Sequence, residues 1–348
     1  MKAIRILVTS TGSPGTTTLV RKLKEVKERK ICVIATDMNS EAGGRFLADR
    51  FYAVPPAKEE DSYVDSIISI LQDEKIDVFF PVSDFEVPVI AKNKERILEK
   101  VDTKIIVNDY KSIIRASNKY ILYKTLKEET NVQIPKFYAP ESLDEFVECV
   151  KLLGYPQEKV CFKPHLSKGS RGFRIISESV NRRDFLLNHK PNSLYMAMDE
   201  FISIFRGEKD FPDLLVMEHL EDVNYDAMVL GNGRESLLTT IKTREEARWG
   251  TIVKGALVYK PELIEACNKI AGVFGLKYNN SVQFIGNKVL EINPRTSTYI
   301  YWTNFIEPYL SIKKILQEIT DEEIQEYKNK IPYGTRFCRY MDQVSFKG

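Results

Sequence analysis

The stretch QFIGNKVLEINPR (Gln283–Arg295) predicts two short strands joined by a Gly-Asn turn. In such a hairpin Gln283 and Glu291 lie on neighbouring strands, while Glu291 and Asn293 face the same side because they are two residues apart. Carboxylate and amide oxygens suit Mg²⁺, and phosphate oxygens can complete its shell. Arg295 follows directly, where a guanidinium can stabilise a phosphoryl group in transfer. We therefore expect a magnesium site in this hairpin, with an ordinary polar surface hairpin as the alternative.

The stretch VCFKPHLSKGSRG (Val160–Gly172) predicts an apolar strand followed by a basic, glycine-containing loop. Lys163 stands at the end of the strand, where its side chain should point into a cleft. Glycines let a backbone wrap around phosphates, to which hydroxyl and backbone N–H groups donate hydrogen bonds. The stretch indicates phosphate binding, although a flexible basic loop without a ligand would look the same. The loop residues that carry this interpretation are Lys168, Gly169, Ser170, Arg171 and Gly172.

The stretch LLVMEHL (Leu214–Leu220) predicts an apolar strand that ends in a carboxylate, Glu218. The end of a strand can present backbone groups to the edge of an adenine. A carboxylate there can accept from the exocyclic amine or from ribose hydroxyls. Taken alone, the stretch is equally compatible with an ordinary strand that has a polar end.

Short apolar runs alternate with amphipathic stretches over residues 1 to about 110. This pattern predicts a parallel sheet with helices on both faces, whose ligands gather where the strands end. Three loops follow those strand ends: Thr9–Gly15, Asp37–Gly44 and Ser83–Glu86. The first is neither a P-loop nor a Gly-x-Gly-x-x-Gly dinucleotide motif. From about residue 191 the chain is rich in strands that alternate in period two, which predicts an antiparallel sheet flanked by helices. The predicted strands of that sheet are Leu214–His219, Tyr225–Leu230, Ser236–Lys242, Thr251–Val258, Val282–Ile285 and Val289–Ile292.

Length and composition limit the classes of protein to which the chain can belong. The 348 residues imply two or three domains, and a net charge of only +2 argues against a nucleic-acid partner. No run approaches the ~20 apolar residues of a membrane helix. Five scattered cysteines without a Cys-x-x-Cys motif suit a reduced cytoplasm, and three unclustered histidines argue against a zinc site. We expect a cytoplasmic protein without a membrane partner.

The order of these stretches along the chain resembles the order of motifs in a known protein family. Lys119, in a Ser-Asn-Lys-Tyr context, precedes Phe-Lys-Pro with its glycine loop, then Met-Glu-His-Leu, then Gln and Glu-Ile-Asn-Pro-Arg. The chain resembles the ATP-grasp superfamily, and most its carbamoyl-phosphate-synthetase-related branch, over nearly its whole length. The resemblance implies an α/β and α+β fold, with a Rossmann-like pre-ATP-grasp domain followed by a two-part ATP-grasp fold that holds the nucleotide between two sheets. The implied domains are 1–112 (pre-ATP-grasp), 113–190 (small lid subdomain) and 191–348 (large subdomain with the metal site).

The resemblance also implies roles for individual residues. ATP and Mg²⁺ are the implied cofactors, with Mn²⁺ as a substitute metal. In the family the ribose is often held by an acidic residue six or seven positions after the hinge glutamate, and Asn224 stands near that position here, so Asn224, Glu221 or Asp226 could hold it. The matching positions are Lys119 and Lys163 for phosphate contacts, Ser167, Lys168, Gly169, Ser170 and Gly172 for the lid, Glu218, His219 and Leu220 for the adenine-binding hinge, Gln283, Glu291 and Asn293 for the metal, and Arg295 for the phosphate.

In this family ATP phosphorylates a carboxylate or bicarbonate, and an amine, ammonia or thiol then attacks the acyl phosphate. A carboxylate acceptor needs a cationic clamp, for which Arg244 and Arg248 are candidates; the alternative is a solvated loop with balanced charges. Asp37 and Asp84, at strand ends of the first domain, could hold an amine, or could be turn and N-cap residues.

We therefore expect an ATP-dependent ligase that joins a small carboxylate to an amine, and the sequence allows a homo-oligomer. A carbamoyl-phosphate-forming enzyme and a non-catalytic ATP-binding regulator are the alternatives from the same family. A nicotinamide-dependent oxidoreductase is disfavoured because the dinucleotide motif is missing. Neither the acid nor the amine can be named from the sequence.

Overall fold

The computed structural model describes residues 1–167, 169, 171–178, 194–248, 251–297, 300–302, 306–340 and 342–346. The chain forms two compact units. Unit 1 comprises Met1–Ser117, Asn224–Phe284 and Glu291–Gly348. Unit 2 comprises Asn118–Val223 and Ile285–Leu290.

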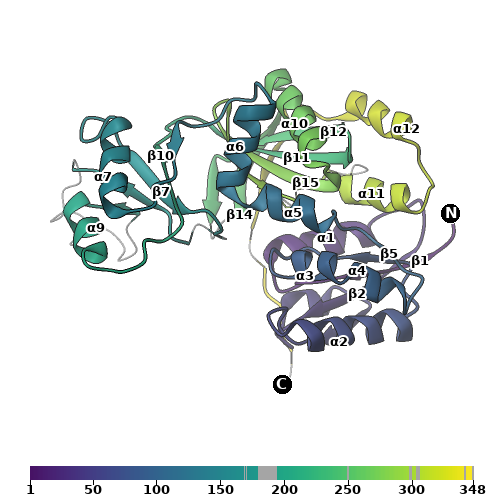
Figure 1. Ribbon diagram of the computed structural model, residues 1–348. Helices are drawn as coiled ribbons and strands as arrows, with labels where there is room; N and C mark the ends of the chain where they lie inside the picture. The colour runs from purple at the N-terminus through teal and green to yellow at the C-terminus, as the bar shows by residue number, and fades with distance from the viewer. Residues whose placement is uncertain are drawn as a thin grey trace. The chain divides into compact units, whose positions relative to one another are not determined.

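The first part of unit 1 is the predicted parallel sheet, with strand order β3-β2-β1-β4-β5 (Figure 1). All four strand pairs are parallel; for example, Ile6 lies opposite both Val33 and Val78. The strands are β1 (Ile4–Val8), β2 (Ile31–Asp37), β3 (Arg50–Ala53), β4 (Val78–Phe80) and β5 (Lys104–Ile105), and the helices are α1 (Pro14–Lys24), η1 (Gly43–Phe46), α2 (Glu60–Asp73), α3 (Glu86–Lys92), α4 (Lys94–Leu98) and α5 (Tyr110–Ser117).

Alternate residues of β1 belong to different cores, so this sheet is buried on both faces. Leu7 packs in a cluster with Tyr63 and Ile67 of α2. Ile6 packs in another cluster with Leu19 of α1 and with residues of α11 (Glu307–Ile315) near the end of the chain. Burial on both faces explains why these strands read as nearly continuous apolar runs.

The second part of unit 1 is the predicted antiparallel sheet, with order β13-β14-β12-β11-β15-β16 and with β17 paired to β14. The predicted hairpin of the opening stretch is present as β15 and β16, and Gly286 in its turn has a φ of 56°, which favours glycine. The strands are β11 (Asn224–Asn232), β12 (Ser236–Thr243), β13 (Glu246–Arg248), β14 (Thr251–Val258), β15 (Lys277–Ile285), β16 (Lys288–Asn293) and β17 (Arg336–Cys338), and the further helices are α10 (Pro261–Phe274), α12 (Asp321–Glu326) and η2 (Tyr327–Lys330).

Unit 2 contains a separate five-stranded sheet with order β6-β10-β7-β8-β9 (Figure 1). Its core is aromatic: the rings of Phe146 on α7 and Phe201 on α9 stack with centroids 3.9 Å apart. The strands are β6 (Phe137–Tyr138), β7 (Val160–Pro164), β8 (Arg174–Ile176), β9 (Tyr195–Met196) and β10 (Leu214–Glu218), and the helices are α6 (Lys119–Glu129), α7 (Leu143–Leu152) and α9 (Met198–Phe205).

The expected sheet membership of one strand is wrong. We assigned Leu214–His219 to the last antiparallel sheet, but β10 pairs with β6 and β7 in unit 2. Local alternation of apolar residues identifies a strand without identifying its partners. The sheet of unit 2 therefore continues beyond residue 190, while the expected domain limits after residues 112 and 190 remain a prediction. In the part of the chain that the structure describes, no helix is long and apolar enough to cross a membrane.

A buried carboxylate, Glu74, ties the strands of the first sheet together at the edge opposite their carboxyl ends. It is 2% exposed and accepts hydrogen bonds from Arg50 Nη1 at 2.8 Å, from Arg5 and from Tyr52. Burial alone would raise the pKa of Glu74. Hydrogen bonds from Tyr52 and Arg50, and the charges of Arg50 and Arg5, outweigh burial, so the pKa lies below its ordinary value of 4.5.

We predict that Glu74→Gln lowers the free energy of unfolding by about 1–3 kcal/mol at pH 7, because hydrogen bonds to a buried charge are weakened. A lowered pKa stabilises the fold above the ordinary value, and that contribution is lost as the pH falls through the folded-state pKa. The difference from the wild type should therefore shrink in acid. Denaturant titrations at pH 7 and pH 4 measure it, and Glu95→Gln on an exposed position of α4 is the control. Equal losses for both variants would contradict the prediction.

Candidate functional site

Lys119 lies where the start of α6 meets the loop that follows β7, within unit 2. Asn118 caps the helix by accepting from the Ile121 amide at 3.1 Å, and the Lys119 amide donates to the His165 carbonyl at 2.9 Å. The Lys119 side chain is buried, and its Nζ donates to the carbonyl (3.1 Å) and the hydroxyl (3.3 Å) of Ser167. The structure thus brings two of the predicted phosphate-binding residues together.

Lys163 is the fourth residue of β7 and is only 4% exposed. Its Nζ donates to the Tyr123 hydroxyl and to the Leu290 carbonyl, both at 3.2 Å. The Tyr123 hydroxyl donates to the same carbonyl at 2.8 Å. An ammonium group loses several kcal/mol of hydration free energy on burial. Ordinary packing therefore does not explain why a lysine occupies this position.

The loop after β7 needs glycine at two positions. Gly169 has a φ of 60° and Gly172 a φ of 75°, a region that side chains other than glycine rarely adopt. A Cβ on Gly172 would also lie 2.7 Å from the ring of Pro164. The predicted lid residues Lys168 and Ser170 lie outside the described residues.

Glu218 ends β10 and is held by two donors within unit 2. Its Oε1 accepts from Lys288 Nζ at 2.5 Å and from the Lys136 amide at 2.8 Å. Burial alone would raise the pKa of Glu218, but these hydrogen bonds and the Lys288 charge bring it below its ordinary value. The amide of His219 donates to the Lys159 carbonyl at 3.2 Å, and Leu220 follows half-buried. The assignment of these three residues to the adenine-binding hinge remains a prediction.

Glu291 and Asn293 face the same side of β16, as expected, since Asn293 Nδ2 donates to Glu291 Oε1 at 3.5 Å. Gln283 lies half-buried on the neighbouring strand β15. Among the described residues, no group of three or more His, Cys, Asp or Glu side chains could hold a metal. The expected donors are one carboxylate and two amide oxygens, a set of hard ligands that fits Mg²⁺.

Arg295 follows β16 and is fixed by Asp84, a contact that we did not predict. Arg295 Nε and Nη2 donate to the two Asp84 carboxylate oxygens, each at 2.5 Å, and Nη1 donates to the Thr296 carbonyl at 2.8 Å. The two residues are 211 positions apart in the chain and both belong to unit 1. Asp84 was considered as a site for an amine, and the structure gives its carboxylate an arginine of the protein instead.

Comparisons with known proteins identify two domains in the chain. The family described as "PylC-like, N-terminal domain" matches residues 6–106, and the family described as "ATP-grasp in the biosynthetic pathway with Ter operon" matches residues 210–335. The chain therefore has a single ATP-grasp unit preceded by an N-terminal domain, as expected.

This ATP-grasp chain is similar to the carbamoyl phosphate synthase large chain of Methanobrevibacter smithii, with 24% identity over 282 residues, or 76% of this chain and 24% of that protein. The expected branch is confirmed, although the chain spans about a quarter of the length of the curated relatives it matches. Two solved structures share its fold. One is a biotin carboxylase–ATP-analogue complex from Campylobacter jejuni (TM-score 0.62, 15% identity, 92% of this chain and 72% of that chain). The other is an L-amino acid ligase from Bacillus licheniformis (TM-score 0.61, 12% identity, 93% and 77%).

The two arginines proposed as a clamp in this ATP-grasp chain have different surroundings. Arg244 is mostly buried, with its Nη1 3.7 Å from Asp226 Oδ2, while Arg248 is exposed and pairs with Glu246 at 2.8 Å. Within the described residues the two guanidinium groups share no partner. The clamp therefore remains a prediction, and Arg244 is its better-placed member.

The residues considered for the ribose also differ. Asn224 begins β11 and is exposed, and its carbonyl accepts from the Arg244 amide at 2.8 Å. Glu221 is ion-paired with Lys159 at 2.5 Å. Asp226 accepts from the Ser281 hydroxyl at 3.1 Å and lies beside Arg244. Asn224 and Glu221 are thus exposed, whereas Asp226 is buried.

The carboxyl ends of the first sheet carry two anchored carboxylates. Asp37 accepts from the Gly12 amide at 2.7 Å. Glu86, the last residue of the predicted loop Ser83–Glu86, accepts from the hydroxyls of Thr9 (2.6 Å) and Ser10 (2.8 Å). Burial raises the pKa of Glu86, and the charge of Asp37 acts in the same direction, while the two hydroxyls oppose it. The edge of the first sheet at the carboxyl ends of its strands is therefore acidic. This is the edge at which we expected a site for an amine.

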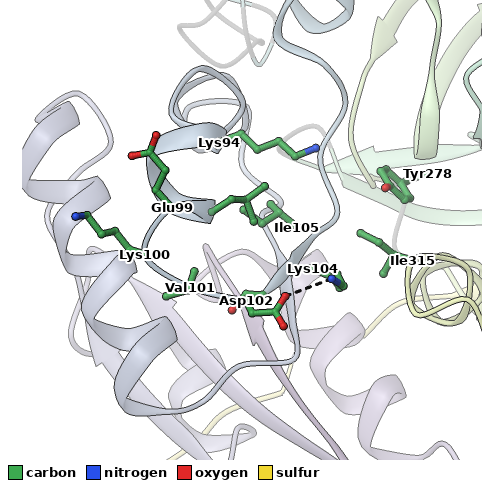
Figure 2. Close-up of a pocket in the computed structure, with 11 residues that line it drawn as sticks. Lys94, Glu99, Lys100, Val101, Asp102, Lys104, Ile105, Tyr278 and Ile315 are labelled. Carbon is green, nitrogen blue, oxygen red and sulfur yellow. Dashed lines mark hydrogen bonds and ion pairs between the residues drawn. The ribbon is translucent and has the colours of Figure 1, made fainter.

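One cavity is lined by none of these residues. It has a volume of about 630 Å³ and is formed by the segment from α4 to β5 together with Tyr278 and Ile315 (Figure 2). Figure 2 shows the ion pair between Lys104 and Asp102. The Lys104 Nζ and Asp102 Oδ1 atoms are 3.4 Å apart. None of the predicted site residues lines it, so size alone does not make it the nucleotide site.

Proposed function

We propose that the chain is an ATP- and Mg²⁺-dependent ligase that phosphorylates a small carboxylate and transfers the acyl group to an amine. The observation that carries the proposal is that two lysines of unit 2, Lys119 and Lys163, are buried. Buried ammonium groups are costly and are retained where they bind an anion or perform chemistry. The ATP-grasp match over residues 210–335 favours the phosphates of ATP as that anion.

The proposed roles follow from position. Lys119 and Lys163 neutralise nucleotide phosphates, and the loop from Ser167 to Gly172 covers them. Glu218, with the backbone of His219 and Leu220, contacts the adenine, and Asn224 the ribose. Mg²⁺, when bound, neutralises charge on the transferring phosphoryl group. The residues proposed to hold the metal are Gln283, Glu291 and Asn293.

Arg295 donates to the phosphoryl group as charge develops on it, which is the type of stabilisation that contributes most in such reactions. The amine then attacks the acyl phosphate, and phosphate leaves with the electron pair of the broken C–O bond. Neither step needs a protein nucleophile. This agrees with the absence of a Ser-His-Asp or Cys-His pattern from the sequence.

The test is a coupled ADP-release assay over paired acids and amines, followed by mass analysis of the product. ADP release that requires both an acid and an amine, with a new C–N bond in the product, supports the proposal. ATP–Mg²⁺ binding without turnover across the panel would favour a non-catalytic ATP-binding regulator instead.

Formation of carbamoyl phosphate is the second candidate, because the curated relatives are carbamoyl phosphate synthase large chains. Bicarbonate is then the acceptor, and ammonia the nucleophile. ADP release with bicarbonate alone, without any organic acid, distinguishes this activity from the first.

The predicted clamp gives a separate expectation. We predict that Arg244→Ala raises KM for the acceptor acid by about tenfold, because a charged hydrogen bond to a carboxylate is lost, and leaves KM for ATP nearly unchanged. Steady-state kinetics with each substrate varied in turn measures both constants. Arg234→Ala, in the turn after β11, is the control. An unchanged acceptor KM would remove Arg244 from the acceptor site.

A further inference from the structure

Asp84 and Arg295 form a two-pronged ion pair that fixes the plane of the guanidinium. Arg295 Nε meets Asp84 Oδ1 and Nη2 meets Oδ2, both at 2.5 Å. Two parallel N–H···O bonds hold orientation as well as position, which a single contact does not. The Arg295 side chain is 15% exposed and that of Asp84 30% exposed.

The backbone beside Arg295 is held independently of Asp84. Asn108, which is 2% exposed, donates from Nδ2 to the Pro294 carbonyl at 3.0 Å and to Asn280 Oδ1 at 2.7 Å. Its Oδ1 accepts from the Lys277 amide at 2.6 Å. Loss of the Asp84 carboxylate should therefore remove two of the contacts that orient the guanidinium, keep the 2.8 Å bond from Nη1 to the Thr296 carbonyl, and leave the turn in place.

Asp84 is itself on a rigid loop. The Ser83 carbonyl accepts from the amides of Glu86 and Val87 at 3.1 and 2.9 Å, and α3 begins at Glu86, two residues after Asp84. The Glu86 side chain is anchored to Thr9 and Ser10. A carboxylate held this firmly can align the flexible side chain of Arg295. Without it, the arginine would have to lose its rotamer freedom in each turnover.

We propose that Asp84 is the positioning residue of Arg295: the N-terminal domain aims the guanidinium with which the ligase contacts the transferring phosphoryl group. This inference rests on the proposed function. Asp84 touches neither substrate nor metal in this scheme and acts only through Arg295. A carboxylate at the acidic edge of the first sheet thereby contributes to catalysis through its ion pair with Arg295.

The experiment compares Asp84→Asn with the wild type in the ADP-release assay. Misorientation of a catalytic group by about 1 Å can cost about 10²-fold, so we expect kcat to fall by about 10- to 100-fold while the Kd for ATP changes less than threefold. In a double-mutant cycle, Asp84→Asn should cause no further loss in an Arg295→Ala background. The matched control is Asp65→Asn, which removes a similar contact, at 2.6 Å, to Arg96 on the surface; its kcat should be unchanged.

A second readout does not depend on turnover. The ¹⁵Nε–H resonance of Arg295, assigned by its loss in Arg295→Lys, should exchange slowly with water in the wild type and quickly in Asp84→Asn. Retention of at least half of the wild-type kcat, equal losses in both backgrounds of the cycle, or unchanged exchange would each overturn the inference. If the wild type releases no ADP with any substrate, the proposed function fails, and the exchange measurement alone decides whether Asp84 orients Arg295.

Discussion

Glu291→Ala is expected to reduce ADP release by at least about 10³-fold, with the protein still folded. Glu291 is the one carboxylate among the proposed metal ligands, and Mg²⁺ depends on carboxylate and phosphate oxygens for most of its binding energy. A metal that stabilises the charge of phosphoryl transfer contributes several kcal/mol, and each 1.36 kcal/mol corresponds to a factor of ten in rate. The measurement is ADP release against Mg²⁺ concentration, since a damaged metal site shifts the half-saturating concentration upward.

The matched variant is Glu291→Gln. A glutamine keeps the length of the side chain and an oxygen for the 3.5 Å contact from Asn293 Nδ2, but it removes the charge. It should lose nearly as much activity as alanine if the carboxylate binds the metal. Glu265→Gln, on the exposed side of α10, should behave like the wild type. Wild-type turnover in either Glu291 variant would show that the metal is held elsewhere.

Features that depend on nearby residues could be predicted from the sequence. The hairpin of β15 and β16 was predicted because two apolar alternations flank a Gly-Asn turn, and Gly286 has the positive φ that such a turn requires. The parallel sheet was predicted for the same reason, since its strands and helices alternate along the chain. The shared side of Glu291 and Asn293 followed from the two-residue period of a strand.

Features that depend on distant residues could not be predicted. β10 has the same alternation as the strands of the other sheet, so nothing local identified its partners β6 and β7. Asp84 and Arg295 each have a role that is plausible alone, and only folding brings them together across 211 positions. In the sequence Glu86 looks like an ordinary acidic residue in the first turn of a helix, where carboxylates are common. Its burial could therefore not be predicted.

Lys163→Met is expected to lower kcat/KM for ATP by about 10²-fold without lowering the melting temperature. A methionine has nearly the volume of the lysine stem, and replacing a buried ion by a well-packed apolar side chain is often neutral or stabilising. The Leu290 carbonyl keeps a donor in the variant, because the Tyr123 hydroxyl donates to it at 2.8 Å. If the role of Lys163 were to stabilise the fold, its removal would leave acceptor oxygens without a hydrogen-bond donor. The melting temperature would then fall.

The control is Lys159→Met, one residue before β7, where the lysine is 39% exposed and pairs with Glu221 at 2.5 Å. That variant should keep both its activity and its melting temperature, since a surface ion pair contributes ~0–1 kcal/mol. Melting curves with and without ATP–Mg²⁺ add a binding readout: the nucleotide should raise the melting temperature of the wild type and of Lys159→Met, and that of Lys163→Met much less. A Lys163→Met protein that melts earlier yet binds ATP normally would make Lys163 a structural residue, and the phosphate contacts would then rest on Lys119 alone.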